Sequence, residues 1–353
     1  MRLLNKIIFT SAPRILLGAF FLCASCEQEE KTDKSRTRAP DPVEKTTPVE
    51  TPQEKGPEIP LEEEPTSPEA SGKPVAETAG GIRFMAYNIE NYLTMTRYVK
   101  GGGKVSSPKD PEEVAALVKI IVGEKPDILG ICEIGTEADL MDLQGKLKAA
   151  GLDLAHFVHT GGIDSTRRLG ILSAFPITGN HSKQKLIYEI NGHERMMGRG
   201  ILDVTIDLPG GSTHFIGLHL KSKRELEDFD QAEIRLNEAR LAREHCDAIL
   251  AAEPNARIVL YGDMNDTRKT PPLAMLMGKY KSDTYMGDVF AKDSRGHLWT
   301  HFWSYQQQYA RFDWVMISPA VYPDVDSENS YIADPDTWND ASDHRAVVVT
   351  LKK

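Results

Sequence analysis

Residues 27–80 divide this chain of 353 residues, because a segment of their composition cannot form a hydrophobic core. The segment contains nine of the chain's 21 prolines and has no Phe, Trp or Tyr. It carries 14 acidic and 7 basic residues. Because the few apolar side chains cannot offset the entropy lost on ordering, we expect a disordered tether with a reach on the order of 40 Å. Folding is therefore expected in residues 81–353.

The first 26 residues have the organisation of a secretory signal. Basic residues come first, an apolar run follows from Ile15 to Leu22, and small residues precede Cys26. Residues 22–26 (LCASC) resemble a bacterial lipobox, in which the last Cys is lipidated and becomes the N-terminus, although Cys23 stands where Leu is usual. The alternative is an uncleaved membrane anchor, for which the apolar run is short. We expect an exported lipoprotein held at a membrane through Cys26.

The charge of the remaining residues limits the function classes. Residues 81–353 have a net charge of −6 within a total of −10. A dedicated DNA-coating protein would normally be basic, so this class is disfavoured, whereas an enzyme that meets phosphates in a local groove is not.

The two cysteines of the folding part have apolar surroundings in the sequence. Cys132 lies in an apolar run and Cys246 on the apolar side of a periodic segment. We expect two buried thiols there and no disulfide or metal pair.

Apolar runs and helical periodicity alternate after Gly81, which predicts an α/β domain of about 270 residues with more than one sheet. Three helices are expected. The first starts at Asp110-Pro111, and the second includes Leu140–Leu147 and ends near Gly151. The third spans Gln231–Ala252. Strands are expected at Ile82–Tyr87, Ile128–Cys132, Leu169–Ser173, Gly200–Ile206, His214–Leu220, Arg257–Tyr261, Phe312–Ile317 and Ala346–Leu351.

Polar side chains directly follow these apolar strands. They are Asn88, Glu133, His219, Asp263 with Asn265, Asp313, and Asp343 with His344. A single carboxylate at such a position is usually a turn former or a helix cap. Recurrence at successive strand ends instead predicts a site, and its hard oxygen ligands suit Mg²⁺ or a similar cation. The lack of a Cys/His ligand cluster argues against zinc.

Six short motifs occur in an order that resembles the endonuclease/exonuclease/phosphatase superfamily, and together they span nearly all of residues 82–353. The motifs are Met85-Ala86-Tyr87-Asn88, Ile131-Cys132-Glu133, Gly217-Leu218-His219-Leu220-Lys221, Gly262-Asp263-Met264-Asn265, Arg311-Phe312-Asp313-Trp314 and Ser342-Asp343-His344. The resemblance implies a four-layer α/β sandwich of two β-sheets flanked by helices. It also implies metal-dependent hydrolysis of a phosphoester. Cys132 and Met264 depart from the usual family residues at packing positions.

The resemblance implies a role for each polar residue. Asn88 and Glu133 are implied at the metal site, Glu133 as the main carboxylate ligand, and Asp343 joins the metal or water network. Asp263 is implied to orient or deprotonate the attacking water, and Asn265 to hold a phosphate oxygen. The expected cofactor is Mg²⁺ or Mn²⁺.

The resemblance also implies two imidazoles at the phosphate. His344 is implied beside the scissile phosphate, oriented by Asp313, and His219 is implied as a second phosphate contact. Because a phosphate anion raises the pKa of a nearby imidazole, both histidines are expected to be charged donors. This set supplies an activated water, charge neutralisation and stabilisation of the leaving oxygen.

The substrate-binding cations are less well defined by the sequence. Arg168 is the first candidate for a phosphate contact and Arg199 the second, with a solvated arginine as the alternative for each. Lys221 is a further candidate, within basic clusters beside the motifs at Arg167-Arg168, Lys221-Lys223-Arg224 and Arg268-Lys269. Such clusters favour a polyanion over a single phosphate.

His156 and His159 are expected to be ordinary exposed or core histidines, although a metal pair is the alternative.

Three functions follow from these residues. The first is an exported metal-dependent phosphodiesterase, a nuclease acting on DNA or RNA. The second is a phosphatase or phospholipase-type esterase that acts on sugar, inositol or lipid phosphates. The third is a tethered binding protein that has lost the chemistry, which the complete set of polar site residues disfavours.

Overall fold

The computed structural model describes residues 81–98, 102–226 and 229–352. The expected signal, the tether and Cys26 lie outside the described residues. Two six-stranded sheets form the centre of the domain. In spatial order, the first sheet consists of β17 (Val325–Ile332), β18 (Val347–Leu351), β1 (Ile82–Tyr92), β4 (Ile128–Ile134), β6 (Arg168–Ser173) and β5 (His156–Thr160). The second consists of β13 (Gly287–Asp288), β16 (Asp313–Ile317), β12 (Arg257–Asp263), β11 (Gly211–His219), β10 (Leu202–Leu208) and β7 (Ile177–Asn180).

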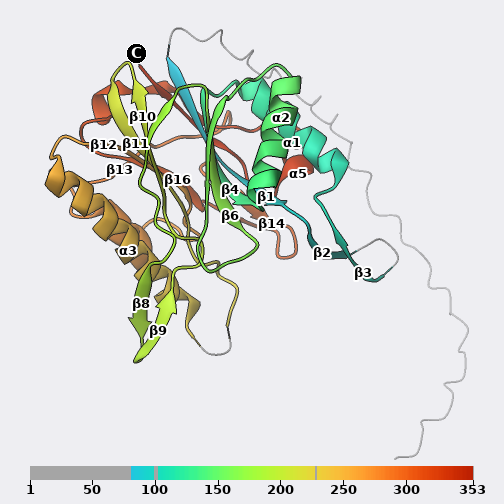
Figure 1. Ribbon diagram of the computed structural model, residues 1–353, viewed down its shortest axis with the longest axis horizontal. Coiled ribbons are helices and arrows are strands. Elements are labelled where there is room, and N and C mark those ends of the chain that lie inside the picture. Colours follow the sequence, from blue (N-terminus) through green and yellow to red (C-terminus); the bar gives the residue numbers. More distant parts are fainter. Residues whose placement is uncertain (1–80, 99–101, 227–228, 353) are drawn as a thin grey trace, which may run out of the picture. The chain divides into compact units, whose positions relative to one another are not determined.

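Helices cover the outer face of each sheet, as Figure 1 shows. The first sheet is covered by α1 (Pro111–Glu124), α2 (Glu137–Ala149) and α5 (Trp338–Ala341). The second is covered by α3 (Gln231–Ala252) and α4 (Pro271–Met277). Three separate hairpins and one 3-10 turn complete the described elements: β2 (Met95–Tyr98) with β3 (Lys104–Ser107), β8 (Ile187–Ile190) with β9 (His193–Met196), β14 (His301–Trp303) with β15 (Gln308–Ala310), and Tyr322–Asp324. The expected four-layer sandwich is confirmed.

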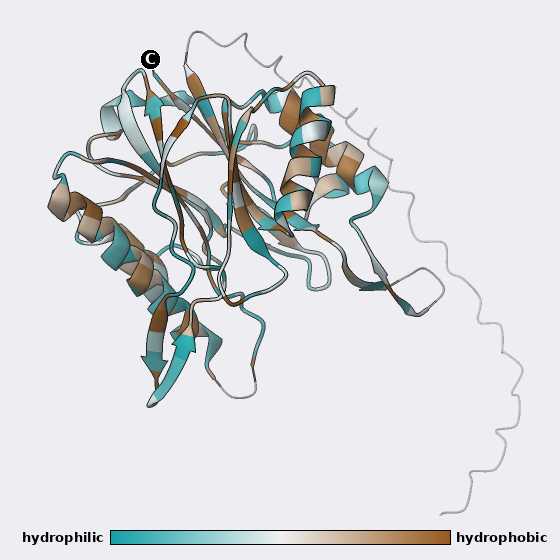
Figure 2. Cartoon of the chain, in the orientation of Figure 1, coloured by the Kyte–Doolittle hydropathy of each residue, from teal (hydrophilic) through white to brown (hydrophobic). Residues whose placement is uncertain are grey.

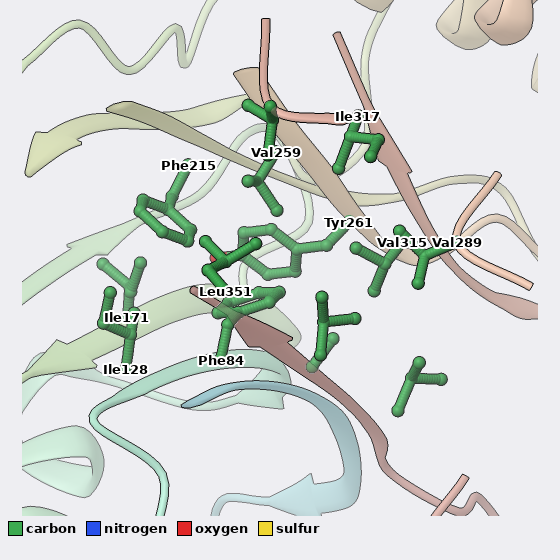
Figure 3. Packing of buried hydrophobic residues seen from close by; sticks show 14 of the residues in the cluster. Phe84, Ile128, Ile171, Phe215, Val259, Tyr261, Val289, Val315, Ile317 and Leu351 are labelled. Atoms are coloured by element: carbon green, nitrogen blue, oxygen red, sulfur yellow. The ribbon is translucent and has the colours of Figure 1, made fainter. Parts of the chain in front are cut away.

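The two sheets pack on a shared apolar core (Figure 3). The ring of Phe84 lies 5.1 Å from that of Phe215 and 4.9 Å from that of Tyr261, centroid to centroid. Tyr261 fits only because Gly130 faces it from the first sheet, since a Cβ at Gly130 would lie 2.2 Å from its ring. Figure 2 shows hydrophobic residues along these strands and mixed hydropathy along α1, α2 and α3, which each bury one side.

Local signals set the helix boundaries where the sequence predicted them. The Asp110 side chain accepts a hydrogen bond from the Glu112 N–H and begins α1. A reciprocal capping box between Thr136 and Asp139 begins α2. The long helix α3 has the predicted bounds and begins after Asp230. The strand predictions were right in place, while β1 and β12 extend further and bring their polar residues into the ladder.

Strand register brings the polar residues to one end of the two sheets. In the first sheet, β1 and β4 are parallel and Asn88 pairs with Cys132, next to Glu133. In the second, β11 and β12 are parallel and His219 pairs with Asp263. Three positions were predicted wrongly, since Asp313 is the first residue of β16, and Asp343 and His344 precede β18. Because β16 is antiparallel to β12 and β18 to β1, the starts of these strands reach the same end.

None of the helices among the described residues is both long and apolar enough to span a membrane.

Candidate active site

Asp263 is the centre of a buried polar cluster at this end of the sheets. Its Oδ2 accepts hydrogen bonds from the amide of Asn88 at 3.1 Å and from the amide of Asn265 at 3.0 Å. Its Oδ1 accepts the backbone N–H of Asn265 at 2.8 Å, and His219 Nε2 lies 3.5 Å from Oδ2. The cluster therefore joins a strand of the first sheet to two strands of the second and fixes the orientation of one carboxylate.

Burial is the main cause that raises the pKa of Asp263, to about 7. The negative charges of Asp313 and Glu133 raise it further, while His344 acts in the opposite direction. A carboxylate whose pKa lies near neutrality can accept a proton from a water and release it again, which is the requirement for a general base.

Asp313 fixes the second imidazole of the cluster. His344 Nδ1 lies 2.7 Å from Asp313 Oδ2, and His344 Nε2 lies 3.4 Å from the Asn88 amide nitrogen. Burial lowers the pKa of His344, but Asp313 and then Asp263 outweigh it and raise the pKa well above its usual range. The carboxylates around His344 therefore favour its charged form already in the free site.

His219 differs from His344 although both are buried. Burial, followed by the charges of Arg199 and His344, lowers the pKa of His219 well below its usual range. Its Nδ1 has no hydrogen-bond partner among the described residues. In the free site, burial and the neighbouring cations therefore disfavour a positive charge on His219, whereas the expectation of a charged donor concerns the phosphate-bound site.

Glu133 lies at an irregularity in the sheet. Its backbone has a φ of 67°, and the register shifts between Cys132 and Ile134. Such a bulge turns a side chain away from the regular alternation, which here directs Glu133 toward the site. Its Oε2 accepts the backbone N–H of Asn91 at 3.0 Å, and its Oε1 lies 3.8 Å from His219 Nε2.

The donor set suits a hard divalent cation. Glu133, Asp263, Asp343 and Glu90 offer carboxylate oxygens, with the amide oxygen of Asn88 nearby. Burial raises the pKa of Glu90 to about 7, and the charge of Asp343 adds to this rise. Raised pKa values at Asp263 and Glu90, with further carboxylates nearby, are expected at a site that a cation would neutralise. The residues therefore fit Mg²⁺ or Mn²⁺.

Two residues of the cluster were missed by the sequence analysis. Glu90 Oε2 accepts the backbone N–H of Asp343 at 3.0 Å, and His301 Nε2 lies 3.6 Å from Asp343 Oδ2. His301, Asp343 and His344 form the one group of three His, Cys or acidic side chains in the described part of the chain whose potential ligand atoms all lie within 4.8 Å of one another. Glu90 lies two positions after Asn88, a spacing that could have indicated it. His301 follows no apolar strand and gave no signal.

The arginine candidates have different positions. Arg199 is nearly buried and pairs with Asp164 at 3.2 Å, and its charge acts on His219. Arg167, which the sequence analysis placed only within a cluster, lies 3.6 Å from Glu133 Oε2. For Arg168, no hydrogen bond or ion pair with the site residues is found within residues 81–98, 102–226 and 229–352. The structure thus brings Arg199 and Arg167 to the site, and Arg168 packs instead beside Gly161.

Helix α3 fixes the position of the loop that follows β11 and begins with Leu220 and Lys221. Glu238 is buried on that helix and accepts the backbone N–H of Gly198 at 3.0 Å and of Lys221 at 2.6 Å. The Lys221 carbonyl accepts a hydrogen bond from Arg235, and its Nζ contacts Ser222 and the Arg224 carbonyl. The ammonium of Lys221 therefore bonds within its own loop, while Glu238 ties together the two loops that carry Arg199 and Lys221.

The other clustered bases are largely paired. Lys223 lies 3.1 Å from Asp266 and 5.4 Å from the ring centre of Phe312, and Arg268 pairs with Asp288. These pairs reduce the free positive charge that the sequence clusters suggested. In the free site the amide nitrogen of Asn265 donates to Leu220 O and to Asp263, and it would have to release one of these bonds to hold a phosphate oxygen.

The remaining candidates have structural positions. His156 and His159 lie on β5 at an odd spacing, which places them on opposite faces, and His159 Nε2 is 2.9 Å from the Gly135 carbonyl. This geometry does not make a chelating pair. Cys132 and Cys246 are buried free thiols, as predicted.

The comparisons with known proteins concern the family and the fold. Residues 104–340 match the sequence profile of the Endonuclease/Exonuclease/phosphatase family. Among curated proteins, none matches the chain.

Several solved structures are similar in fold. An endonuclease/exonuclease/phosphatase family protein from Leptotrichia buccalis has a TM-score of 0.53 and 13% identity, covering 77% of this chain and 100% of its own. D. rerio TDP2 complexed with single strand DNA product has a TM-score of 0.51 and 15% identity, covering 77% and 99%. The Bacteroides thetaiotaomicron mannosyl-6-phosphatase has a TM-score of 0.51 and 15% identity, covering 76% and 98%.

Proposed function

Because this chain belongs to the endonuclease/exonuclease/phosphatase family, whose members are phosphoester hydrolases, we propose that it is a metal-dependent phosphodiesterase that cleaves DNA or RNA. The observation that carries this proposal is the buried cluster around Asp263. A carboxylate with a pKa near 7 lies within reach of two amides and a neutral imidazole. A charged imidazole is held beside it.

Each residue has a task in this reaction. Asp263, oriented by Asn88 and Asn265, accepts the proton of a water that attacks phosphorus. His344, kept charged by Asp313, donates to the phosphate as negative charge develops. The bond between phosphorus and the leaving oxygen then breaks.

The metal ligands are proposed as Glu133 and Asn88, with Asp343 in the surrounding network. Mg²⁺ or Mn²⁺ bound there would neutralise charge on the phosphate and the leaving oxygen. Glu90 and His301 orient Asp343 through its backbone and its carboxylate.

A phosphatase or phospholipase-type esterase is the second candidate. It is favoured by the pairing of Lys223 with Asp266 and of Arg268 with Asp288, because paired bases grip a polyanion less strongly.

Purified full-length protein, assayed with Mg²⁺ on plasmid DNA, RNA, bis-p-nitrophenyl phosphate and inositol phosphates, tests both candidates. Cleavage of DNA or RNA that H344A lacks supports the first. Release of inorganic phosphate from inositol phosphates alone supports the second, and no hydrolysis of any substrate refutes both.

We also propose that the protein is an exported lipoprotein, tethered by residues 27–80 to a membrane through Cys26. The support is the signal-like N-terminus and the tether composition. Fractionation of cells that express C26S tests this, since a soluble variant supports lipidation and a membrane-bound variant contradicts it.

A further inference from the structure

The hairpin of β14 and β15 is joined directly to the candidate active site. The backbone N–H of Phe302 donates to the carbonyl of Asp343 at 3.0 Å, and the backbone of His301 pairs with that of His344 in a single antiparallel β-bridge. At the base of the hairpin, Thr300 Oγ1 accepts the backbone N–H of Asp313 at 3.0 Å. The position of this hairpin is therefore fixed relative to the reacting groups.

The two faces of the hairpin differ. Side chains alternate along a strand, so His301 and Trp303 share one face while Phe302 lies on the other. Phe302 stacks on Tyr309 with ring centres 4.4 Å apart, and Trp299 packs on Tyr309 at 4.7 Å. The His301 ring lies 4.6 Å from His344. The face that carries Trp303 is thus continuous with the site, and the Tyr309 face is directed away from it.

The site-facing side of the hairpin presents aromatic surface without charge. Trp303 is 47% exposed and Tyr305 is 85% exposed, with ring centres 6.1 Å apart. Gln308 pairs with Trp303 across the hairpin and is exposed. Residues 298–310 contain no Asp, Glu, Lys or Arg. Such a surface cannot grip phosphates, but it can stack on a planar ring and offer an amide to the ring's edge.

Resting on the proposed phosphodiesterase function, we propose that Trp303 stacks on a base of single-stranded nucleic acid adjacent to the scissile phosphate. Bases in a duplex are already stacked and paired, so only an unpaired base can use this face. Lys223 packs on Phe312, on which His301 also stacks at 5.1 Å, but it is paired with Asp266, so the hairpin offers a ring surface and no free cation beside it. Recognition through bases also explains how the site would select nucleic acid although most of its rim cations are paired.

Binding of the full-length protein to a labelled oligothymidine and to an abasic oligomer of equal length, measured by fluorescence anisotropy in EDTA, tests this inference. The two ligands carry the same phosphates and differ only in their bases. We expect wild type to bind the oligothymidine roughly tenfold or more tightly than the abasic oligomer, and W303A to lose this preference. W303F should keep most of it, because a ring remains.

Y309A is the matched control, since it removes an exposed aromatic ring from the opposite face of the same hairpin. It should keep the preference for bases. Equal affinity of wild type for both ligands, no binding to either, or equal losses in W303A and Y309A would overturn the inference. So would loss of binding to phosphatidylcholine vesicles in W303A with the base preference intact. Hydrolysis of the abasic oligomer with Mg²⁺ reports separately on the proposed function.

Discussion

His344 and His219 both approach Asp263 Oδ2, at 3.9 Å and 3.5 Å, but their electrostatic surroundings differ. Both imidazoles are buried, but Asp313 and Asp263 raise the pKa of His344. By contrast, burial and then the charge of Arg199 lower the pKa of His219. The comparison shows that burial lowers the pKa of both imidazoles and that nearby carboxylates reverse this only at His344. The same cluster therefore holds two histidines whose pKa values are shifted in opposite directions.

The largest effects on kcat are expected from substitutions of Asp263 and His344. D263N or H344A should each lower kcat by roughly 10²–10⁴, equivalent to about 3–5 kcal/mol, because a general base or a charged donor is lost. Steady-state kinetics on a DNA or RNA substrate measure this. Both variants should fold as judged by circular dichroism, and near-wild-type rates in both would contradict the assigned roles.

Removal of the metal should abolish turnover, whatever the charge of His344 or His219. EDTA should stop the reaction, and added Mg²⁺ or Mn²⁺ should restore it, because carboxylate oxygens alone cannot neutralise a phosphate. E133Q should bind the cation more weakly, which calorimetry in the absence of substrate can measure. Full activity after exhaustive chelation would exclude the metal site.

A smaller effect is expected from the substitution E238Q, which alters the loops that carry Arg199 and Lys221. E238Q replaces one carboxylate oxygen with a donor that faces a backbone N–H, so the loops that carry Arg199 and Lys221 should lose their fixed position. We expect KM for the substrate to rise several-fold, in line with about 1 kcal/mol for a disrupted hydrogen bond, with kcat little changed.

D203N is the matched control for E238Q. Asp203 is also a buried carboxylate with two hydrogen-bond partners, His214 and His245, and it lies beneath the same helix without touching the site loops. It should lower the melting temperature without changing KM. A similar rise of KM in both variants would show that general destabilisation, and not loop position, causes the effect.

The smallest effect is expected from removal of residues 1–80. Because residues 27–80 lack core-forming side chains, a chain that starts at Gly81 should keep its melting temperature and turnover. Differential scanning calorimetry and kinetics measure this. A large loss of stability would show that the segment contributes to the fold and would contradict its role as a tether.

The sequence by itself determined the elements that local chemistry specifies. Asp110, Pro111 and the apolar positions after them define α1, and the periodicity of residues 231–252 gave α3 its bounds. Short motifs with polar residues at strand ends predicted the family and the sandwich. The helix signals are local, because backbone geometry and side-chain spacing are coupled directly, whereas the family was indicated by the order of six short motifs along the chain.

Only the tertiary structure decided which residues meet and which charges they carry. Asp313 and His344 reach the site because their strands run antiparallel to β12 and β1, a pairing that no local pattern encodes. His301 arrives on a hairpin far along the chain, and Arg167, which precedes β6, meets Glu133 where the sequence favoured Arg168. The opposite pKa shifts of His219 and His344 likewise depend on charges that lie close in space and far apart in sequence.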